Sequence, residues 1–180
     1  MRIYVAGHKG LVGSALVRAI DKHPDHAWIG KTRSELDLLD RKAVFDFLAS
    51  QEPDAVIVAA AKVGGIMANS TYPVEFLSEN LQIETNLIDG AHAANIEKLL
   101  FLGSSCIYPK LSRQPIKEEY LLTGPLESSN EPYALAKISG LKLVEAYRRQ
   151  HQRKWISAMP TNVYGPGDNF DETTSHALPA

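Results

Sequence analysis

The chain has 180 residues, a formal net charge of −2, and 44% hydrophobic and 22% charged residues. This composition is typical of a globular domain, and it excludes a disordered tail, a collagen-like fibre and a basic arm that binds nucleic acid. The longest apolar runs, such as Ala55 to Ala61, are too short to cross a bilayer, so we expect no membrane association. Cys106 is the only cysteine, which excludes an internal disulfide and a multi-cysteine metal site and favours a reducing, cytoplasmic location.

Strand-like and helix-like segments alternate along the whole chain. The predicted strands are apolar and cover Arg2 to Ala6, Ala27 to Thr32, Asp54 to Ala60, Lys98 to Gly103 and Trp155 to Met159. The predicted helices run from Leu11 to Asp21, from the N-cap Asp40 to Pro53, from Pro73 to about Ala94 and from Pro132 to about Gln150. This alternation predicts one α/β domain over residues 1–180, with a doubly wound, Rossmann-type parallel sheet.

A turn with three glycines separates the first strand from the first helix, with the sequence Gly7-His8-Lys9-Gly10-Leu11-Val12-Gly13. Gly7 allows a tight turn, Gly10 lets the backbone approach a pyrophosphate, and Gly13 lets the helix pack close to the strand. The helix N–H groups then face the phosphates. A glycine turn can also serve packing alone, but its place after an N-terminal buried strand favours dinucleotide binding.

The end of the second strand indicates which dinucleotide binds. NAD sites place a carboxylate there to accept a hydrogen bond from the ribose 2′-OH. Here the residues are Lys31-Thr32-Arg33-Ser34, without an acid. Arg33 carries a planar guanidinium that suits a 2′-phosphate, and Lys9 adds a second positive charge. We therefore expect NADP(H) rather than NAD(H), although a solvated surface patch is the common alternative for such residues.

Tyr133 and Lys137 are four residues apart at the start of the helix after Pro132, so they share one face. A nearby ammonium favours the phenolate, so we expect the pKa of Tyr133 to lie below its usual value of about 10. Ser104 and Ser105 follow the fourth predicted strand, and ligands of open α/β sheets bind at that edge. Tyr-x-x-x-Lys alone is common by chance, but these elements together predict proton transfer at a carbonyl or alcohol.

The glycine turn, Ser104-Ser105 and Tyr133-x-x-x-Lys137 together resemble the extended short-chain dehydrogenase/reductase family. The likeness covers nearly the whole chain, and it is greatest to the members that epimerise GDP-4-keto-6-deoxy-D-mannose at C3 and C5 and reduce it at C4 to give GDP-L-fucose. The segments that carry it are Ala60-Ala61-Lys62-Val63-Gly64-Gly65-Ile66, Gly103-Ser104-Ser105-Cys106-Ile107-Tyr108-Pro109, Asn130-Glu131-Pro132-Tyr133-Ala134 and Met159-Pro160-Thr161-Asn162-Val163-Tyr164-Gly165-Pro166.

The resemblance implies a role for each matching catalytic residue. Tyr133 matches the general acid that protonates the C4 oxygen, Lys137 the residue that holds the nicotinamide ribose, and Ser104 the serine beside that oxygen. Cys106 and His176 match the base and acid of the two epimerisations, which a thiolate and an imidazolium can perform near neutral pH. Taken alone, Cys106 reads as a small buried hydrophobe and His176 as a surface residue.

The resemblance also implies a GDP-sugar substrate, and a homodimer through the helices of residues 73–94 and 132–150. The alternative for these helices is that both apolar faces are buried within one chain. The expected NADP(H) contacts are Gly7, His8, Lys9, Gly10, Leu11, Val12, Gly13, Arg33, Asp37, Leu38, Leu102, Gly103, Ser104, Ser105, Lys137, Pro160, Thr161, Asn162, Val163 and His176.

The family's chains are longer than this one and continue into a smaller substrate domain, which we expect to be missing here. Two other functions therefore stay open. One is a different nucleotide-sugar epimerase or dehydratase on the same scaffold, although Ser104-Ser105-Cys106 lacks the acid pair of the dehydratases. The other is an NADP-binding module without turnover.

Overall fold

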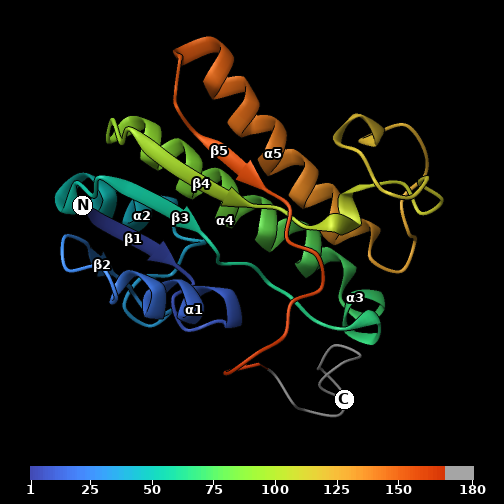
Figure 1. Cartoon of the computed structure of the whole chain (residues 1–180), viewed down its shortest axis with the longest axis horizontal. Helices are drawn as coiled ribbons and strands as arrows, with labels where there is room; N and C mark the ends of the chain where they lie inside the picture. Colours follow the sequence, from blue (N-terminus) through green and yellow to red (C-terminus); the bar gives the residue numbers. More distant parts are fainter. Residues whose placement is uncertain (169–180) are drawn as a thin grey trace.

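The computed structural model describes residues 1–168 of the chain. Strands and helices alternate within this range (Figure 1). The strands are β1 (Arg2–Ala6), β2 (Ala27–Ile29), β3 (Ala55–Val58), β4 (Lys98–Leu102) and β5 (Ile156–Ala158). The α-helices are α1 (Leu11–Ile20), α2 (Arg41–Gln51), α3 (Ile66–Thr71), α4 (Pro73–Ala93) and α5 (Glu131–His151), and the short 3-10 helices are η1 (Ser105–Ile107) and η2 (Glu118–Tyr120).

The strands form one sheet in the order β2-β1-β3-β4-β5, and each neighbouring pair is parallel. Parallel pairing brings the carboxyl ends of the strands to one edge of the sheet. The strand order reverses direction between β1 and β3, and ligands of doubly wound sheets bind at such a point. The predicted doubly wound parallel sheet is therefore confirmed.

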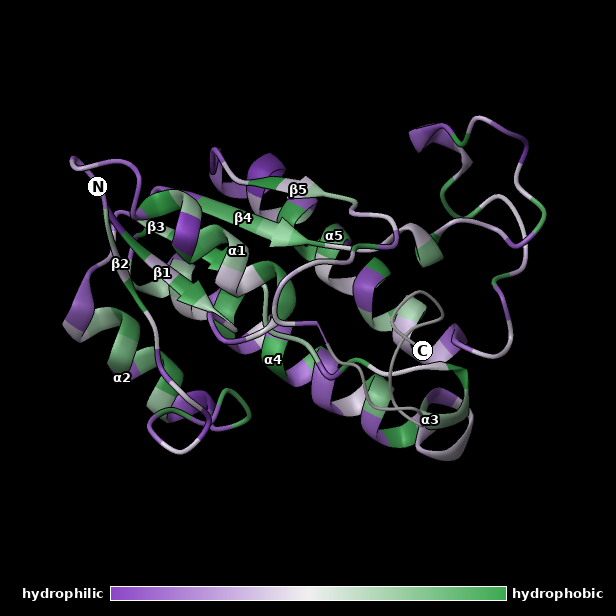
Figure 2. Cartoon of the chain, turned by 60° about the horizontal axis from the view of Figure 1, so that its bottom comes forward, coloured by the Kyte–Doolittle hydropathy of each residue, from purple (hydrophilic) through white to green (hydrophobic). Residues whose placement is uncertain are grey.

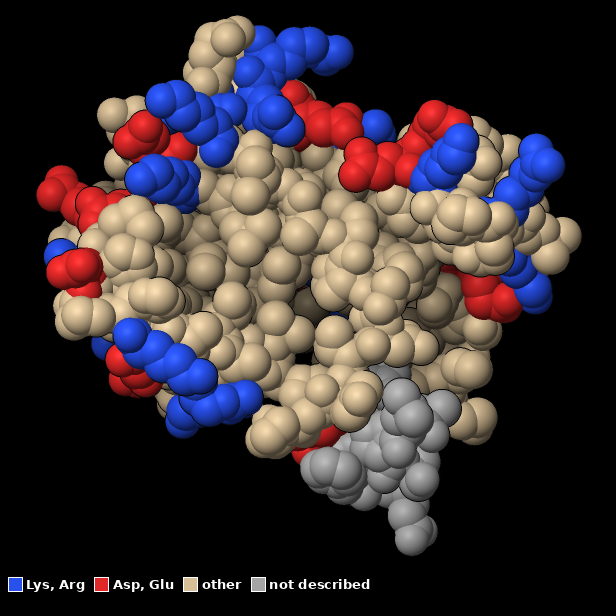
Figure 3. Space-filling view, viewed as in Figure 1, with Lys and Arg blue, Asp and Glu red and all other residues tan. Residues whose placement is uncertain are grey.

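Helix α1 covers one face of the sheet only in part. Ile3 and Val5 are buried on this face against Ile20 of α1. The strand register places Val5, Ile57, Leu100 and Ile156 in one row across the sheet; Val5 is buried, Ile57 and Leu100 are half-buried, and Ile156 is 56% exposed. Charged side chains lie around the rim of the molecule in this view and leave its centre uncharged (Figure 3). Beyond α1, this face is open and apolar.

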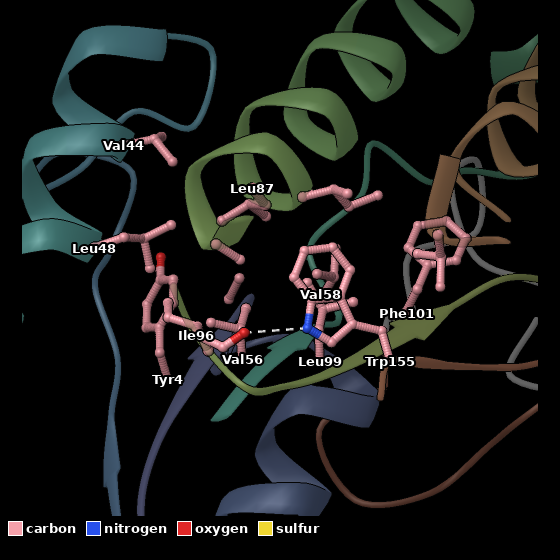
Figure 4. Close-up of a cluster of buried hydrophobic side chains, with 14 of the residues drawn as sticks. Tyr4, Val44, Leu48, Val56, Val58, Leu87, Ile96, Leu99, Phe101 and Trp155 are labelled. Atoms are coloured by element: carbon pink, nitrogen blue, oxygen red, sulfur yellow. Dashed lines mark hydrogen bonds between the residues drawn. The ribbon is translucent and has the colours of Figure 1, made fainter. Parts of the chain in front are cut away.

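The opposite face carries the main core, which α2, α4 and α5 cover (Figures 1 and 2). Side chains alternate along β1, so Tyr4 and Ala6 point into this core while Ile3 and Val5 point the other way. Trp155 is completely buried, and its indole N–H donates to the carbonyl oxygen of Ile96 at 3.2 Å (Figure 4). That bond satisfies the one polar atom of the largest core side chain.

The predicted elements are found, with differences at their ends. The side chain of Asp40 accepts a hydrogen bond from the backbone N–H of Ala43 at 3.0 Å, which confirms it as the N-cap of α2. The strand predicted over Ala27 to Thr32 ends at Ile29, where the parallel pairing of this edge strand with β1 stops. Helix α3 was not predicted, because its sequence Ile-Met-Ala-Asn-Ser-Thr has no apolar periodicity.

No helix in residues 1–168 is both long and apolar enough to cross a bilayer. Within the same range, no group of three or more His, Cys, Asp or Glu side chains could hold a metal ion.

We expect the Trp155→Ala substitution to destabilise the domain by about 3–5 kcal/mol, because it leaves a large cavity and an unpaired carbonyl at Ile96. The neighbouring Ile156→Ala change, at a 56% exposed side chain, is the control and should cost about 0.5 kcal/mol or less. Urea unfolding followed by circular dichroism measures both. Equal losses for the two variants would contradict the burial described here.

Candidate functional site

A cavity of about 1220 Å³ lies along the carboxyl edge of the sheet. Its walls come from the glycine turn, from the segments that follow β2, β3, β4 and β5, and from the first turns of α5. Pockets for small ligands usually measure about 300–1,000 Å³. This cavity is therefore large enough for an extended ligand such as a dinucleotide.

The glycine turn has the geometry that its sequence predicts. Gly7 has φ +86°, and a Cβ there would lie 2.7 Å from the backbone nitrogen of Ala60. A Cβ on Gly13 would lie 2.1 Å from the carbonyl oxygen of Gly7, so α1 approaches the turn too closely for any side chain. Gly10 is the N-cap of α1 and offers no side-chain cap to the helix N–H groups. The first turn of α1 therefore presents free donors at the cavity wall.

The segment after β2 brings two cations to the cavity. Lys31 and Arg33 both line it, and among residues 1–168 each has only a long, exposed ion pair, to Glu35 at 3.8 Å and to Asp37 at 3.9 Å. Such exposed pairs are weak and leave the cations available. The carboxylate of Glu35 accepts hydrogen bonds from the backbone N–H and the hydroxyl of Thr32, at 2.8 and 2.7 Å. Glu35 is thus occupied locally, and this end of the cavity favours an anion.

Tyr133, Ser104 and Cys106 meet at the other end of the cavity. Tyr133 lies in the first turn of α5, and Ser104 is the N-cap of η1, directly after β4. The hydroxyl of Ser104 accepts a hydrogen bond from the backbone N–H of Cys106 at 3.4 Å. This contact fixes the serine beside the thiol, with its own O–H still able to donate.

Lys137 forms a buried ion pair with Glu84, a residue that the sequence analysis did not predict for the site. Its Nζ atom lies 3.0 Å from the Oε1 atom of Glu84 on α4 and donates to the carbonyl oxygen of Leu102 at 3.1 Å. The two side chains are only 3% and 1% exposed. Neither oxygen of Glu84 has a well-formed hydrogen bond among the described residues, so the ion pair is its main compensation. Glu84 lies three residues from both Leu81 and Leu87, so helical periodicity could have placed it on the buried face.

Burial is the largest cause of the pKa shifts of the three groups around Lys137, which are Glu84, Cys106 and Tyr133. It raises the pKa of Glu84 to about 7, although the Lys137 charge opposes this. Burial also raises the pKa of the Cys106 thiol, against the lowering effects of Ser104 and Lys137. The expected lowering of the Tyr133 pKa is wrong, because burial raises it, and Cys106 and Glu84 raise it further. The Nζ atom of Lys137 is 5.8 Å from the Tyr133 ring centroid, and Glu84 offsets its charge.

Most of the residues predicted for the cofactor line the cavity. They are Gly7, Gly10, Leu11, Val12, Arg33, Asp37, Leu38, Leu102, Gly103, Ser104, Ser105, Lys137, Pro160, Thr161, Asn162 and Val163. His8, Lys9 and Gly13 do not. His8 packs its ring against Trp28 on the far side of the turn, Lys9 is exposed, and Gly13 is buried under Gly7. His176 lies outside the described residues.

The segment after β3 adds cavity residues that the sequence analysis missed. The side-chain amide of Asn69 donates to the carbonyl oxygens of Gly64 and Gly65, at 2.9 and 3.1 Å, while its buried Oδ1 atom has no hydrogen-bond partner among the described residues. Asn80 on α4 clamps Lys62 by accepting from its N–H and donating to its C=O, at 2.8 and 3.0 Å. The sequence marked the segment from Ala60 to Ile66 but not these partners, because the contacts depend on the placement of α3 and α4.

The chain matches a family of enzymes that use a nucleotide cofactor, in agreement with a dinucleotide cavity. A family model described as "NAD dependent epimerase/dehydratase family" matches residues 3–180. GDP-L-fucose synthase of Escherichia coli (strain K12) is 56% identical over 179 residues, which are 99% of this chain and 56% of that protein. The chain therefore spans about half the length of the curated relatives it matches.

Solved structures show the same fold. The GDP-mannoheptose C4 reductase MlghC from Campylobacter jejuni, solved with NADP bound, has a TM-score of 0.93 and 39% identity, over 99% of this chain and 53% of that one. A GDP-L-fucose synthetase from Naegleria fowleri bound to NADP has a TM-score of 0.89 and 31% identity, over 99% of this chain and 59% of that one. With a family model matching nearly its whole length, the chain belongs to the NAD dependent epimerase/dehydratase family.

Proposed function

We propose that this chain is the NADP-binding part of a GDP-L-fucose synthase, which epimerises GDP-4-keto-6-deoxy-D-mannose at C3 and C5 and reduces it at C4. One observation carries the proposal: a single cavity joins the glycine turn and Arg33 at one end to Ser104, Tyr133 and Lys137 at the other. The identity to curated GDP-L-fucose synthases, 55–57% for four of them, supports the substrate class.

The cavity fits an extended cofactor that carries two anionic groups, a pyrophosphate and a 2′-phosphate. The pyrophosphate would lie on the first turn of α1, where Gly10 leaves the backbone open. The 2′-phosphate would lie at Arg33 and Lys31, which are the available cations there. Lys137 would hold the nicotinamide ribose. When bound, NADPH supplies the hydride for C4.

The residues of this chain supply the proton and the orientation. Hydride arrival at C4 turns the ketone oxygen into an alkoxide that must be protonated. Tyr133, whose raised pKa keeps it a phenol, is the proton donor. Ser104 donates a hydrogen bond to the same oxygen and steers it toward Tyr133. This arrangement suits reduction, which needs a protonated tyrosine, better than alcohol oxidation.

Epimerisation needs a base and an acid on opposite faces of the sugar, because the 4-keto group acidifies the C–H bonds at C3 and C5. Cys106 lines the cavity next to Ser104 and can provide the base once it loses its proton. His176 would provide the acid, and its role stays a prediction from the sequence. No observation favours the alternatives, a related nucleotide-sugar epimerase or dehydratase and an NADP-binding module without turnover.

We also propose that residues 1–180 form the cofactor domain and that the further length of the relatives supplies the substrate domain. The open apolar face beside Ile156 gives such a segment a surface to cover. A cytoplasmic location, in keeping with the single cysteine, stays a prediction.

The Arg33→Ala substitution should weaken NADPH binding by about 1.5–3 kcal/mol, the range of a hydrogen bond to a charged group, and leave NADH binding nearly unchanged. Titration calorimetry with both cofactors measures this. The control is Arg149→Ala, at an exposed arginine near the end of α5. Equal affinities of the unsubstituted chain for NADPH and NADH would contradict the proposed 2′-phosphate site.

Tyr133 and Cys106 should separate the two halves of the reaction. The test protein joins residues 1–180 to the C-terminal half of the E. coli relative. Tyr133→Phe should block NADPH oxidation and still let solvent deuterium enter C3 and C5 of the keto sugar. Cys106→Ser should stop or greatly slow deuterium uptake and leave NADPH binding intact. Unchanged uptake in Cys106→Ser would remove that residue from the mechanism.

We propose a homodimer through α4 and α5. Leu87, Ile88, Ile138 and Leu141 are buried within the chain, so they are not free for an interface. Leu135 remains 41% exposed on α5 and is available. Light scattering at micromolar concentration should give twice the chain mass of 19.8 kDa, and Leu135→Lys should reduce it. A mass of one chain for the unsubstituted protein would rule the dimer out.

A further inference from the structure

The Glu84–Lys137 pair is a buried pair of charges that the mechanism above uses only in part. Buried ion pairs seldom stabilise a fold more than apolar residues would, so their presence next to a site calls for a reason. Both side chains are almost completely inaccessible, and they belong to two helices that pack side by side, α4 and α5.

The surrounding structure makes room for this pair. A Cβ on Gly140 would lie 2.6 Å from the Oε2 atom of Glu84 and 2.5 Å from the ring of Phe101. Phe101 lies under Lys137, with 4.9 Å between its ring centroid and the Nζ atom. Gly140 thus leaves room for the carboxylate, while the Phe101 ring and the Leu102 carbonyl lie against the ammonium.

Two proton-transfer groups face the ammonium from the cavity side. Tyr133 is on the same helix, with its ring centroid 5.8 Å from Nζ, and the Lys137 charge also acts on the thiol of Cys106 in η1. The other charged pair in this part of the wall, Lys62 and Glu79, is closed on itself at 3.0 Å. Within the described residues, Glu84 is therefore the carboxylate that determines how much of the Lys137 charge reaches the site.

We propose that Glu84 is a positioning residue that holds the ammonium of Lys137 and neutralises its charge, and thereby sets the acidity of Tyr133 and Cys106. This rests on the proposed function, because it gives Tyr133 and Cys106 their proton-transfer roles. With Glu84 ionised, the pair has no net charge, so Tyr133 stays a phenol that can donate. With Glu84 neutral, the pair carries a charge of +1, which favours both the phenolate and the thiolate.

The single cysteine allows a direct test that needs neither cofactor nor substrate. The rate of alkylation by iodoacetamide, measured against pH, reports the pKa of Cys106 alone. Glu84→Gln keeps the side-chain shape and removes the charge, so the midpoint should fall by about one pH unit. Lys137→Met should raise it, and Glu84→Gln in the Lys137→Met background should have no further effect.

Two more variants separate charge from packing. Glu145→Gln removes an exposed carboxylate that pairs with Lys142 at 2.9 Å on α5, and should leave the midpoint unchanged. Glu84→Asp keeps the charge, so it should retain the wild-type midpoint if Glu84→Gln fails to fold. Three results would overturn the proposal. The first is an unchanged or raised midpoint in folded Glu84→Gln, and the second is a shifted midpoint in Glu84→Asp. The third is an equal shift when Glu84→Gln is made in the Lys137→Met background.

The pH dependence of stability gives a second measurement. The pKa of Glu84 is raised from 4.5 to about 7 in the folded chain, so between these values the folded state holds a proton that the unfolded state has lost. The unfolding free energy of the wild type should therefore fall, relative to Glu84→Gln, as pH rises through this window. If the difference in unfolding free energy between the two proteins stays constant across this window, folding does not raise the pKa of Glu84, and the buried pair described above is contradicted. If the chain does not bind NADPH, the proposed function fails, whereas the alkylation midpoints and the pH dependence of stability remain valid tests of the Glu84–Lys137 pair.

Discussion

Parallel pairing across the whole sheet is the constraint on which the site depends. Because neighbouring strands run in the same direction, the segments that leave β1, β2, β3, β4 and β5 all begin at one edge. The glycine turn, the cations after β2 and the serines after β4 come from distant parts of the chain and meet in one cavity. The cavity wall is therefore a consequence of topology, and only its chemistry is a matter of individual residues.

In the proposed function, the buried pair of Glu84 and Lys137 then sets the acidity of the proton-transfer groups. Lys137 lines the cavity from α5, and Glu84 on the neighbouring helix α4 gives it a partner of opposite charge. A lysine without this partner would push Tyr133 toward the phenolate, which accepts a proton. Burial raises the pKa of Tyr133 most and Glu84 adds to it, so the tyrosine stays protonated, in agreement with the proposed reduction.

The sequence was sufficient for the elements that local patterns determine. Gly7 and Gly13 have no alternative residue, since a Cβ at either position would strike backbone atoms, and their spacing directly after an apolar strand identified the turn. Tertiary contacts were harder to predict. His8 was expected at the cofactor but turns to Trp28, and Glu84 was overlooked although it lies on the apolar face of α4. The expected pKa of Tyr133 was wrong for the same reason, because burial, Cys106 and a carboxylate from another helix all raise it.

The most direct measurement of the central claim is a crystal structure of this chain grown with NADPH. The account predicts the pyrophosphate on the backbone N–H groups of Leu11 and Val12 in the first turn of α1, the 2′-phosphate within hydrogen-bond distance of Arg33, and the nicotinamide next to Tyr133 and Ser104. Cofactor bound with its 2′-phosphate away from Arg33, or with its nicotinamide outside the end of the cavity formed by Tyr133 and Ser104, would contradict it.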